Sequence, residues 1–425
     1  MHHSLVRGTT WNLAGYLYLI IASLVSTPLL IHALGLTQFA QYGLIIATLA
    51  LSSSFDLGLP QAVVRALARE QKSYSERQSI WATSSFLFIT TGFLSAILAT
   101  FVVSRFNHLP LIWLLTFVLA LMTSLTSHYS TLPQAEGHFG YFNVKTFVVG
   151  TGNTLLAAYL ASRGYDIALI LAGQVGCYLL SLFILAYFSL KFFPHPREGR
   201  PSLVLAKSLL NFGIKNQLGK VVGQVQAQYA KYLLASVNPL SLSAYLISAG
   251  LVQKLSGGIS QLGSALYPAS ARSSGLSLRA LYYRLQCGLF LTALLGILVF
   301  RVWGLGFLEW WLHAPELSSI VYSLMQVLIW YFAILVLTPL ASVILDSRGR
   351  PEITSFFAFI TTTLEIVMAL LLFSRYGLFA PVYASLIAVL LTTPFLLYST
   401  EKVLTSGLPL AKRSNISRSG VESRV

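Results

Sequence analysis

A regular line of lysines and glutamines runs along one otherwise apolar stretch, residues 212–232. Its members are spaced by three, four, four and three residues, which places them on one helical face; they are Gln217, Lys220, Gln224, Gln228 and Lys231. Ammonium groups bind phosphate as point charges, and amides exchange hydrogen bonds with hydroxyl groups. A lysine near the centre of a bilayer costs roughly 2.5 to 3.5 kcal/mol on insertion scales, so it normally faces a bundle interior or a watery cavity. The line therefore predicts the wall of a cavity for an anionic, hydroxyl-rich ligand.

A second apolar stretch, residues 243–269, repeats this pattern with fewer charges. Lys254 lies far from both ends of the stretch, and Gln261 follows two helical turns later on the same face. Lys215 lies just before the first line. For Lys215 and Lys231 an alternative stays open, in which the side chains reach the two membrane interfaces. Lys220 and Lys254 are too deep for that and are expected in the cavity.

Cations outnumber acids in the apolar stretches. The cations are Lys215, Lys220, Lys231, Lys254 and Arg301, and the acids are Glu365, Glu309 and Asp56. Pairing one with one would leave at least two cations that need another anion or a water-filled cavity. Glu365 has two open roles, coupling to an ion gradient by protonation or pairing with a cavity cation. Asp56 either pairs with Arg65 or ends a helix beside Gly58.

The composition places these stretches in a membrane. Hydrophobic residues make up 56% of the 425 residues and charged ones 10%, whereas a soluble domain carries roughly a quarter charged. Each span needs about 20 apolar residues. Twelve spans are predicted, at residues 11–34, 39–57, 80–103, 109–128, 141–162, 167–188, 212–232, 243–269, 285–311, 320–345, 353–373 and 378–398.

The net charge of +15 follows from topology, not from nucleic-acid binding. One set of loops and ends holds most of the basic residues, among them Arg65, Arg69, Lys72, Arg77, Lys145, Lys191, Arg197, Arg200, Arg279, Arg284, Arg348, Arg350, Lys402, Lys412 and Arg413. The opposite loops hold only Arg105, Arg163 and Arg375. Because excess lysine and arginine mark the cytoplasmic side, both termini are expected there.

The spans are expected to form two related six-helix lobes. The predicted divisions are an N-terminal lobe at residues 1–190, a cytoplasmic linker at 191–207, a C-terminal lobe at 208–398 and a basic tail at 399–425. Aligning Tyr42 with Tyr245 and Pro133 with Val343 gives nearly equal offsets of 203 and 210 residues. An even number of spans per repeat gives both copies the same orientation, and binding is expected between them.

The sequence contains no pattern that is typical of a catalytic site or a metal site. No nucleophile constellation, metal spacing or phosphate loop is present, and Cys177 and Cys287 fall inside predicted spans. We therefore expect no catalytic residue, no metal site and no cofactor. Coupling to a proton or sodium gradient stays open.

Several short motifs carry a resemblance to a known family. They include Asn12 with Pro28 and Gly35 in the first hairpin, the sequence Asp56-Leu57-Gly58-Leu59 before a basic loop, Phe212-Gly213 opening the seventh span, and the Gly349-Arg350 joint. With these the chain resembles the polysaccharide transport family of the multidrug/oligosaccharidyl-lipid/polysaccharide (MOP) exporter superfamily, and is similar to its O-antigen flippases. The resemblance implies twelve helices in two lobes around a central cationic cavity.

The resemblance also implies a function. It is the export of undecaprenyl-pyrophosphate-linked sugar repeat units across the bacterial inner membrane by alternating access. Lys220, Lys231 and Lys254 are then expected to hold the pyrophosphate, and the glutamines to contact sugar. Other polysaccharide assembly proteins are possible partners. The alternatives are a multidrug exporter or a peptidoglycan-precursor flippase of the same superfamily, and, from another class, a membrane glycan polymerase or ligase.

Overall fold

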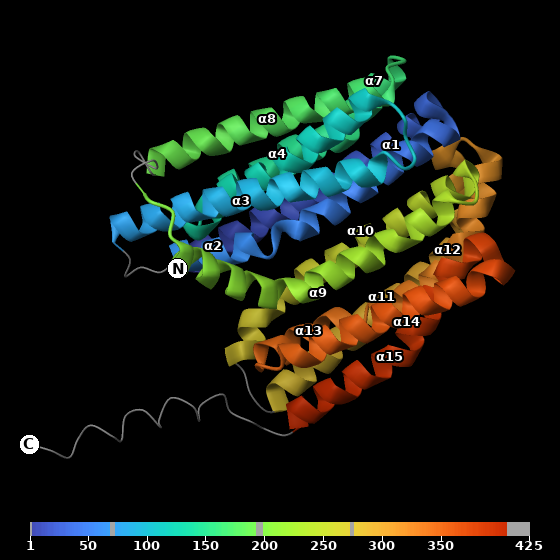
Figure 1. Cartoon of the computed structure of the whole chain (residues 1–425). Helices are drawn as coiled ribbons and strands as arrows, with labels where there is room; N and C mark the ends of the chain where they lie inside the picture. Colours follow the sequence, from blue (N-terminus) through green and yellow to red (C-terminus); the bar gives the residue numbers. More distant parts are fainter. Residues whose placement is uncertain (1, 69–72, 193–198, 273–275, 406–425) are drawn as a thin grey trace, which may run out of the picture. The chain divides into compact units, whose positions relative to one another are not determined.

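The chain folds into helices throughout the part that the structure describes. This computed structural model describes residues 2–68, 73–192, 199–272 and 276–405, so the basic tail beyond residue 405 and the middle of the predicted linker lie outside it. Within these ranges every regular element is a helix (Figure 1). The predicted all-helical membrane fold is confirmed.

The twelve predicted spans each coincide with a helix or a broken helix. The long elements are α1 (His2–Ser52), α3 (Tyr74–Val103), α4 (Pro110–Ala135), α8 (Ile167–Phe192), α9 (Leu203–Ala235), α10 (Pro239–Arg272), α11 (Leu276–Leu312), α12 (Pro315–Leu335), α14 (Pro351–Tyr376) and α15 (Ala380–Thr405). The shorter ones are η1 (Ser53–Asp56), α2 (Leu59–Leu67), α5 (Phe139–Phe142), α6 (Val144–Thr151), η2 (Gly152–Leu156), α7 (Ala157–Ser162), α13 (Thr338–Ser347) and η3 (Gly377–Phe379).

Breaks in the helices have local causes. α1 holds two predicted spans and turns at Gly35, whose φ of 70° and ψ of 168° suit glycine alone. The fifth span runs through α6, the π-turn η2 and α7, and the tenth through α12 and α13. α9 begins at Leu203, inside the segment predicted as linker, because the Ser202 hydroxyl caps it by accepting from the Leu205 N–H.

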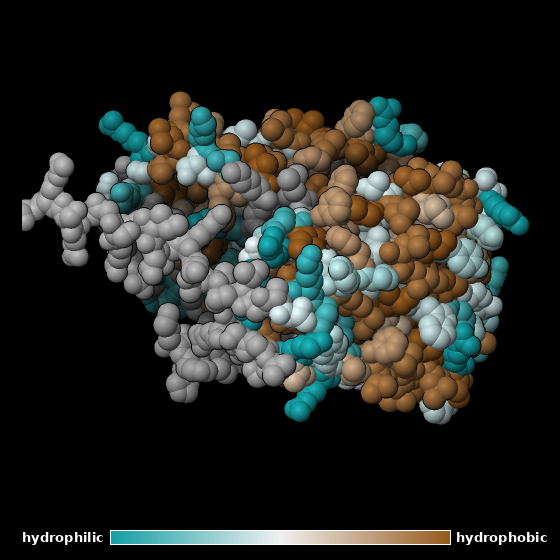
Figure 2. Space-filling model, turned by 90° about the horizontal axis from the view of Figure 1, so that it is seen from below, coloured by the Kyte–Doolittle hydropathy of each residue, from teal (hydrophilic) through white to brown (hydrophobic). Residues whose placement is uncertain are grey.

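Apolar side chains cover much of the surface. Among the residues that the structure describes, seven stretches are long and apolar enough to cross a membrane, and some of them hold two predicted spans. Broad apolar areas reach the face shown in Figure 2, as a lipid-facing surface requires.

Packing divides the chain into two compact units, each described by itself. The first comprises Met1–Ile247 and Leu308–Val321, and the second comprises Ser248–Phe307 and Tyr322–Val425. Compactness and internal repetition are different criteria, so the predicted lobes at 1–190 and 208–398 stay a prediction.

In the first unit α9 lies against the end of α1 and the start of α2. A methyl group added at Gly58 would clash with the Gly213 carbonyl oxygen, so the two backbones touch. Beside this contact the Arg65 guanidinium lies 4.3 Å from the centre of the Phe212 ring. Farther along α9, the Tyr232 hydroxyl bonds the Thr48 hydroxyl at 2.8 Å.

The turn between α11 and α12 also belongs to the first unit. The Trp311 indole N–H donates to the Leu24 carbonyl oxygen at 2.8 Å, and His32 Nε2 lies 2.9 Å from the Leu312 carbonyl oxygen. These bonds attach the turn to the first half of α1. His313 adopts a φ of 48° at this turn, and its ring centre lies 6.1 Å from that of His32.

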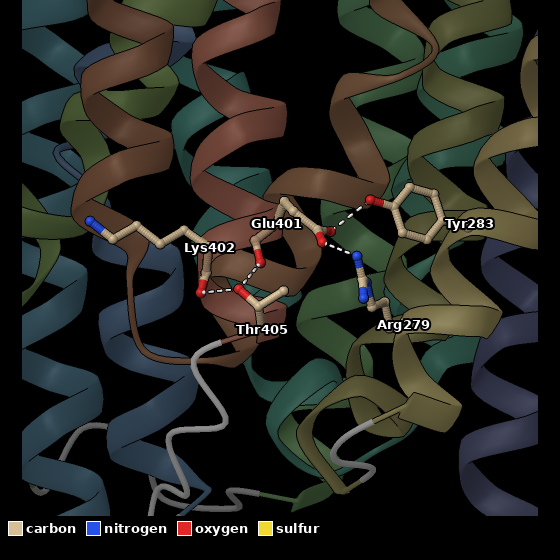
Figure 3. Close-up of polar contacts among 5 residues, drawn as sticks. All are labelled: Arg279, Tyr283, Glu401, Lys402 and Thr405. Carbon is tan, nitrogen blue, oxygen red and sulfur yellow. Dashed lines mark hydrogen bonds and ion pairs between the residues drawn. The ribbon is translucent and has the colours of Figure 1, made fainter.

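In the second unit an acid joins the first turns of α11 to the end of α15. Glu401 accepts from the Arg279 guanidinium, and its other oxygen accepts from the Tyr283 hydroxyl at 2.6 Å, while Lys402 points away (Figure 3). In the first unit, Arg77 at the start of α3 likewise pairs with Glu136 at the end of α4. Arg77 and Arg279 are 202 residues apart, close to the predicted repeat offset. Some loop arginines predicted from topology alone therefore also hold helix ends together.

Gly58 is expected to tolerate no side chain. Gly58→Ala would combine left-handed strain, about 1–2 kcal/mol, with a clash against the Gly213 carbonyl oxygen. Gly137 has a similar φ of 75° but nothing within 4 Å of an added methyl group, so Gly137→Ala isolates the strain. Gly213→Ala isolates the clash. Thermal unfolding of the detergent-purified variants should rank Gly58→Ala as the least stable, and equal losses for Gly58→Ala and Gly137→Ala would contradict the backbone contact.

Candidate functional site

The polar face of α9 has two ends with different hydrogen bonds. At the packing end a glutamine binds the main chain of a neighbouring element, and at the paired end a lysine binds a glutamine of the same helix. The Gln217 amide nitrogen donates to the Ser54 carbonyl oxygen at 3.0 Å, and the Gln217 side chain is buried. This bond ties α9 to η1, so the Gln217 amide nitrogen serves helix packing. The side chains of Lys215 and Lys220 lie outside the described residues, and their predicted roles stay predictions.

Toward the other end of α9, a lysine and a glutamine bind each other. The Lys231 ammonium donates to the Gln228 amide oxygen at 2.7 Å, one helical turn away. Gln228 is 6% exposed and Lys231 is half-buried. Gln224, one turn earlier, is also half-buried. The charge of Lys231 is therefore held on the polar face beside an amide, which is the arrangement that an anion with hydroxyl groups would meet.

Lys254 lies on α10 and belongs to the second unit. Its side chain is half-buried, and its ammonium nitrogen lies 4.0 Å from the position of a methyl group built on Gly250. Lys254 thus lies along its own helix, over the glycine one turn earlier. The Gln261 side chain lies outside the described residues.

Glu365 is the most deeply buried of the predicted site acids. It is 3% exposed on α14, and the Ser385 hydroxyl of α15 donates to one of its oxygens at 2.6 Å. One turn before it, the Thr361 hydroxyl bonds the Thr392 hydroxyl at 2.8 Å. Glu365 therefore lies in a polar seam between the last two helices of the second unit.

Asp56 ends the helix in which it lies. Its carboxylate accepts from the Gly58 N–H at 2.9 Å, and Leu57 and Gly58 both have a positive φ. Of the two roles predicted for Asp56, this geometry supports the helix-ending one. Asp56 also acts electrostatically on Lys145.

A polar cavity in the first unit escaped the sequence prediction. It has a volume of about 260 Å³ and lies among α1, η1, α3, α4 and α6. Asp56 and Lys145 both line it, together with the hydroxyl groups of Ser52, Ser53, Thr91, Ser95, Thr123 and Ser124. Lys145 was counted among the basic residues of the cytoplasmic loops; it lies in α6, near the start of the predicted span at 141–162, and donates to the Ser127 hydroxyl at 2.9 Å. Serines and threonines four residues apart were the available signal, and such spacing equally suits plain helix packing.

The described residues contain no group of three or more histidine, cysteine or acidic side chains that could ligate a metal ion.

Solved structures share this fold. A mutant of the Vibrio cholerae MATE transporter VcmN matches with a TM-score of 0.65 at 15% identity, covering 95% of this chain and 97% of that one. A MOP superfamily transporter from Pyrococcus furiosus, whose binding pocket has a reverse polarity that suggests a different function, matches with a TM-score of 0.61 at 16% identity over 94% and 96% of the two chains. These similarities show that the chain shares the fold of these transporters.

Sequence comparison identifies the family. A putative O-antigen transporter of Shigella flexneri is 24% identical over 196 residues, which are 44% of this chain and 47% of that protein. The matched part thus spans about half the length of that relative. Residues 5–274, more than half of the chain, match the family described as polysaccharide biosynthesis protein. The chain is a multi-pass membrane protein, and it belongs to the polysaccharide biosynthesis protein family.

Proposed function

We propose that this protein is a flippase for undecaprenyl-pyrophosphate-linked O-antigen or other polysaccharide repeat units. It moves them from the cytoplasmic to the periplasmic leaflet by alternating access, and it carries out no catalysis. The observation that supports this best is the lysine and glutamine face of α9 in a member of the polysaccharide biosynthesis family. The putative O-antigen transporter among its relatives points to the same class of substrate.

The physical task fits a cavity lined by cations and amides. A pyrophosphate with several sugars would be costly to carry through hydrocarbon without compensating partners, whereas the lipid tail is stable there. A polar path through the protein solvates the head group while the tail stays in lipid. Because the required partners are cations for phosphate and amides for hydroxyl groups, the α9 face suits this substrate better than it suits a cationic drug.

Individual side chains take separate roles in this proposal. Lys231 and Lys254, with Lys215 and Lys220, hold the pyrophosphate. Gln224, Gln228 and Gln261 contact sugar hydroxyl groups, and Gln217 fixes α9 against η1. The protein resides in the bacterial inner membrane with both termini in the cytoplasm, as the distribution of basic residues favours.

Replacing Lys231 or Lys254 should slow lipid transfer. In vesicles that contain a lipid-pyrophosphate oligosaccharide, a membrane-impermeant sugar-oxidising reagent measures how much lipid reaches the far leaflet. Lys231→Met and Lys254→Met should each reduce the rate by about 10-fold or more, because a charge-assisted hydrogen bond contributes about 1.5–3 kcal/mol. Lys402→Met makes the same chemical change at an exposed site that points away from its neighbours in Figure 3, so its rate should stay unchanged.

Two results would contradict parts of the proposal. If Lys231→Met and Lys254→Met both transfer lipid at the wild-type rate, at equal protein per vesicle, these lysines do not bind the pyrophosphate. Longer glycans in the products, with no transfer of any lipid, would favour a membrane glycan polymerase instead.

Glu365 is proposed to couple transfer to an ion gradient. Glu365→Gln keeps a partner for the Ser385 hydroxyl but removes the charge. Rates measured with and without a proton or sodium gradient should then become equal in the variant, while the wild-type protein runs faster with one gradient. Ser385→Ala is the matched control, because it removes the hydrogen bond and keeps the acid. A wild-type rate indifferent to both gradients, with Glu365→Gln equally active, would rule out this role.

A further inference from the structure

We propose that the polar cavity among η1, α3, α4 and α6 is a monovalent-cation site and that the ammonium group of Lys145 is its resident cation. This cavity is distinct from the α9 face. The inference rests on the hydrogen bonds and charges of the first unit and is independent of the transported substrate.

The walls of the cavity present hydrogen-bond acceptors. Five lining hydroxyl groups each donate their single proton to a main-chain carbonyl of a helix at 2.7–2.9 Å; they belong to Ser52, Ser53, Thr91, Ser95 and Ser124. A hydroxyl group whose proton is used in this way retains only oxygen lone pairs for other partners. The surroundings therefore favour a cation or a strong N–H donor over an anion.

The cavity is also lined by two charged side chains. Asp56 contributes a carboxylate that acts electrostatically on Lys145, and the Lys145 ammonium donates to the Ser127 hydroxyl at 2.9 Å. Among the lining residues that the structure describes, Lys145 is the one with a positive charge. One positive and one negative side chain therefore line a cavity whose other polar groups are hydroxyl groups.

Close helix packing fixes this geometry. A methyl group added at Gly92 would lie 2.7 Å from the Ser124 side chain, so α3 and α4 touch beside the cavity. The Ser124 hydroxyl crosses this contact to the Phe88 carbonyl oxygen. The cavity volume of about 260 Å³ exceeds the roughly 30 Å³ of a water molecule several-fold, so a small cation could bind together with water.

Removing the ammonium group should make the site accept a free cation. In Lys145→Ala the side chain is short, and either Na⁺ or methylammonium can take the place of the lost charge. Thermal unfolding of the full-length protein in detergent is compared in chloride salts of these two cations and of bulky N-methyl-D-glucamine, at constant ionic strength. The melting temperature of Lys145→Ala should rise by about 1–3 °C in Na⁺ or methylammonium.

The matched variants should lack this response. Wild-type protein already holds its own cation, and Lys145→Met fills the same space without charge, so neither should distinguish the three salts. Lys402→Ala tests for a general effect of lysine removal and should also show none. A melting temperature of Lys145→Ala that is equal in all three salts would overturn the inference.

A double-mutant cycle keeps the inference testable where Lys145→Ala does not fold. Asp56→Asn retains an acceptor for the Gly58 N–H and removes the negative charge. Asp56→Asn and Lys145→Met should each destabilise the protein, and together they should destabilise it by less than the sum, because the second change removes the unbalanced charge that the first one leaves. Strictly additive effects would show that Lys145 does not serve as the cation of this site.

Discussion

Polar groups carried into hydrocarbon must find their partners within the protein, and this constraint shapes the interior of both units. Bound water is scarce at membrane depth, so amide, hydroxyl and carboxylate groups face either one another or the main chain. The Gln217 amide reaches the Ser54 carbonyl oxygen, the Ser385 hydroxyl reaches Glu365, and Trp311 reaches the Leu24 carbonyl oxygen. Each of these bonds joins segments that are apart in sequence and so fixes how two helices meet.

The need for hydrogen-bond partners is met in two different ways along the polar face of α9. Gln217 and Gln228 share one helical face, yet the first binds the main chain of η1 and the second binds Lys231 on its own helix. A pair within one helix can open to a substrate without unpacking a neighbour. The Gln217 bond, in contrast, joins two segments and lies one helical turn from the contact of Gly58 with Gly213. The regular line of the sequence thus contains two kinds of residue.

Ion pairs between the ends of helices contribute little to the stability of the fold. Arg77 with Glu136, and Arg279 with Glu401, are partly exposed, and such pairs contribute about 0–1 kcal/mol each. Lys145 and Asp56 line one cavity together with hydroxyl groups, and Asp56 acts electrostatically on Lys145. These two charges lie on different elements of the first unit, so their interaction also joins segments far apart in sequence.

The sequence by itself determined the class of the fold and the positions of its helices. Apolar length, basic loops and the glycine at residue 35 are local signals, and each of the twelve predicted spans matches a helix or a broken helix. The line on α9 was likewise visible, because helical periodicity converts spacing directly into a shared face. The sequence also reduced Asp56 to two roles, of which the structure supports the ending of a helix beside Gly58.

Only the tertiary structure decided which polar side chains meet. Lys145 was predicted as a loop cation, yet it lines a cavity with Asp56, 89 residues earlier, and with hydroxyl groups from α1, η1, α3 and α4. The division of α9 into a packing end and a paired end was also beyond the sequence. The physical reason is that membrane helices are apolar toward lipid and toward each other, so hydropathy does not tell which face meets which neighbour. That choice depends on glycine contacts and shape complementarity between segments far apart in the chain.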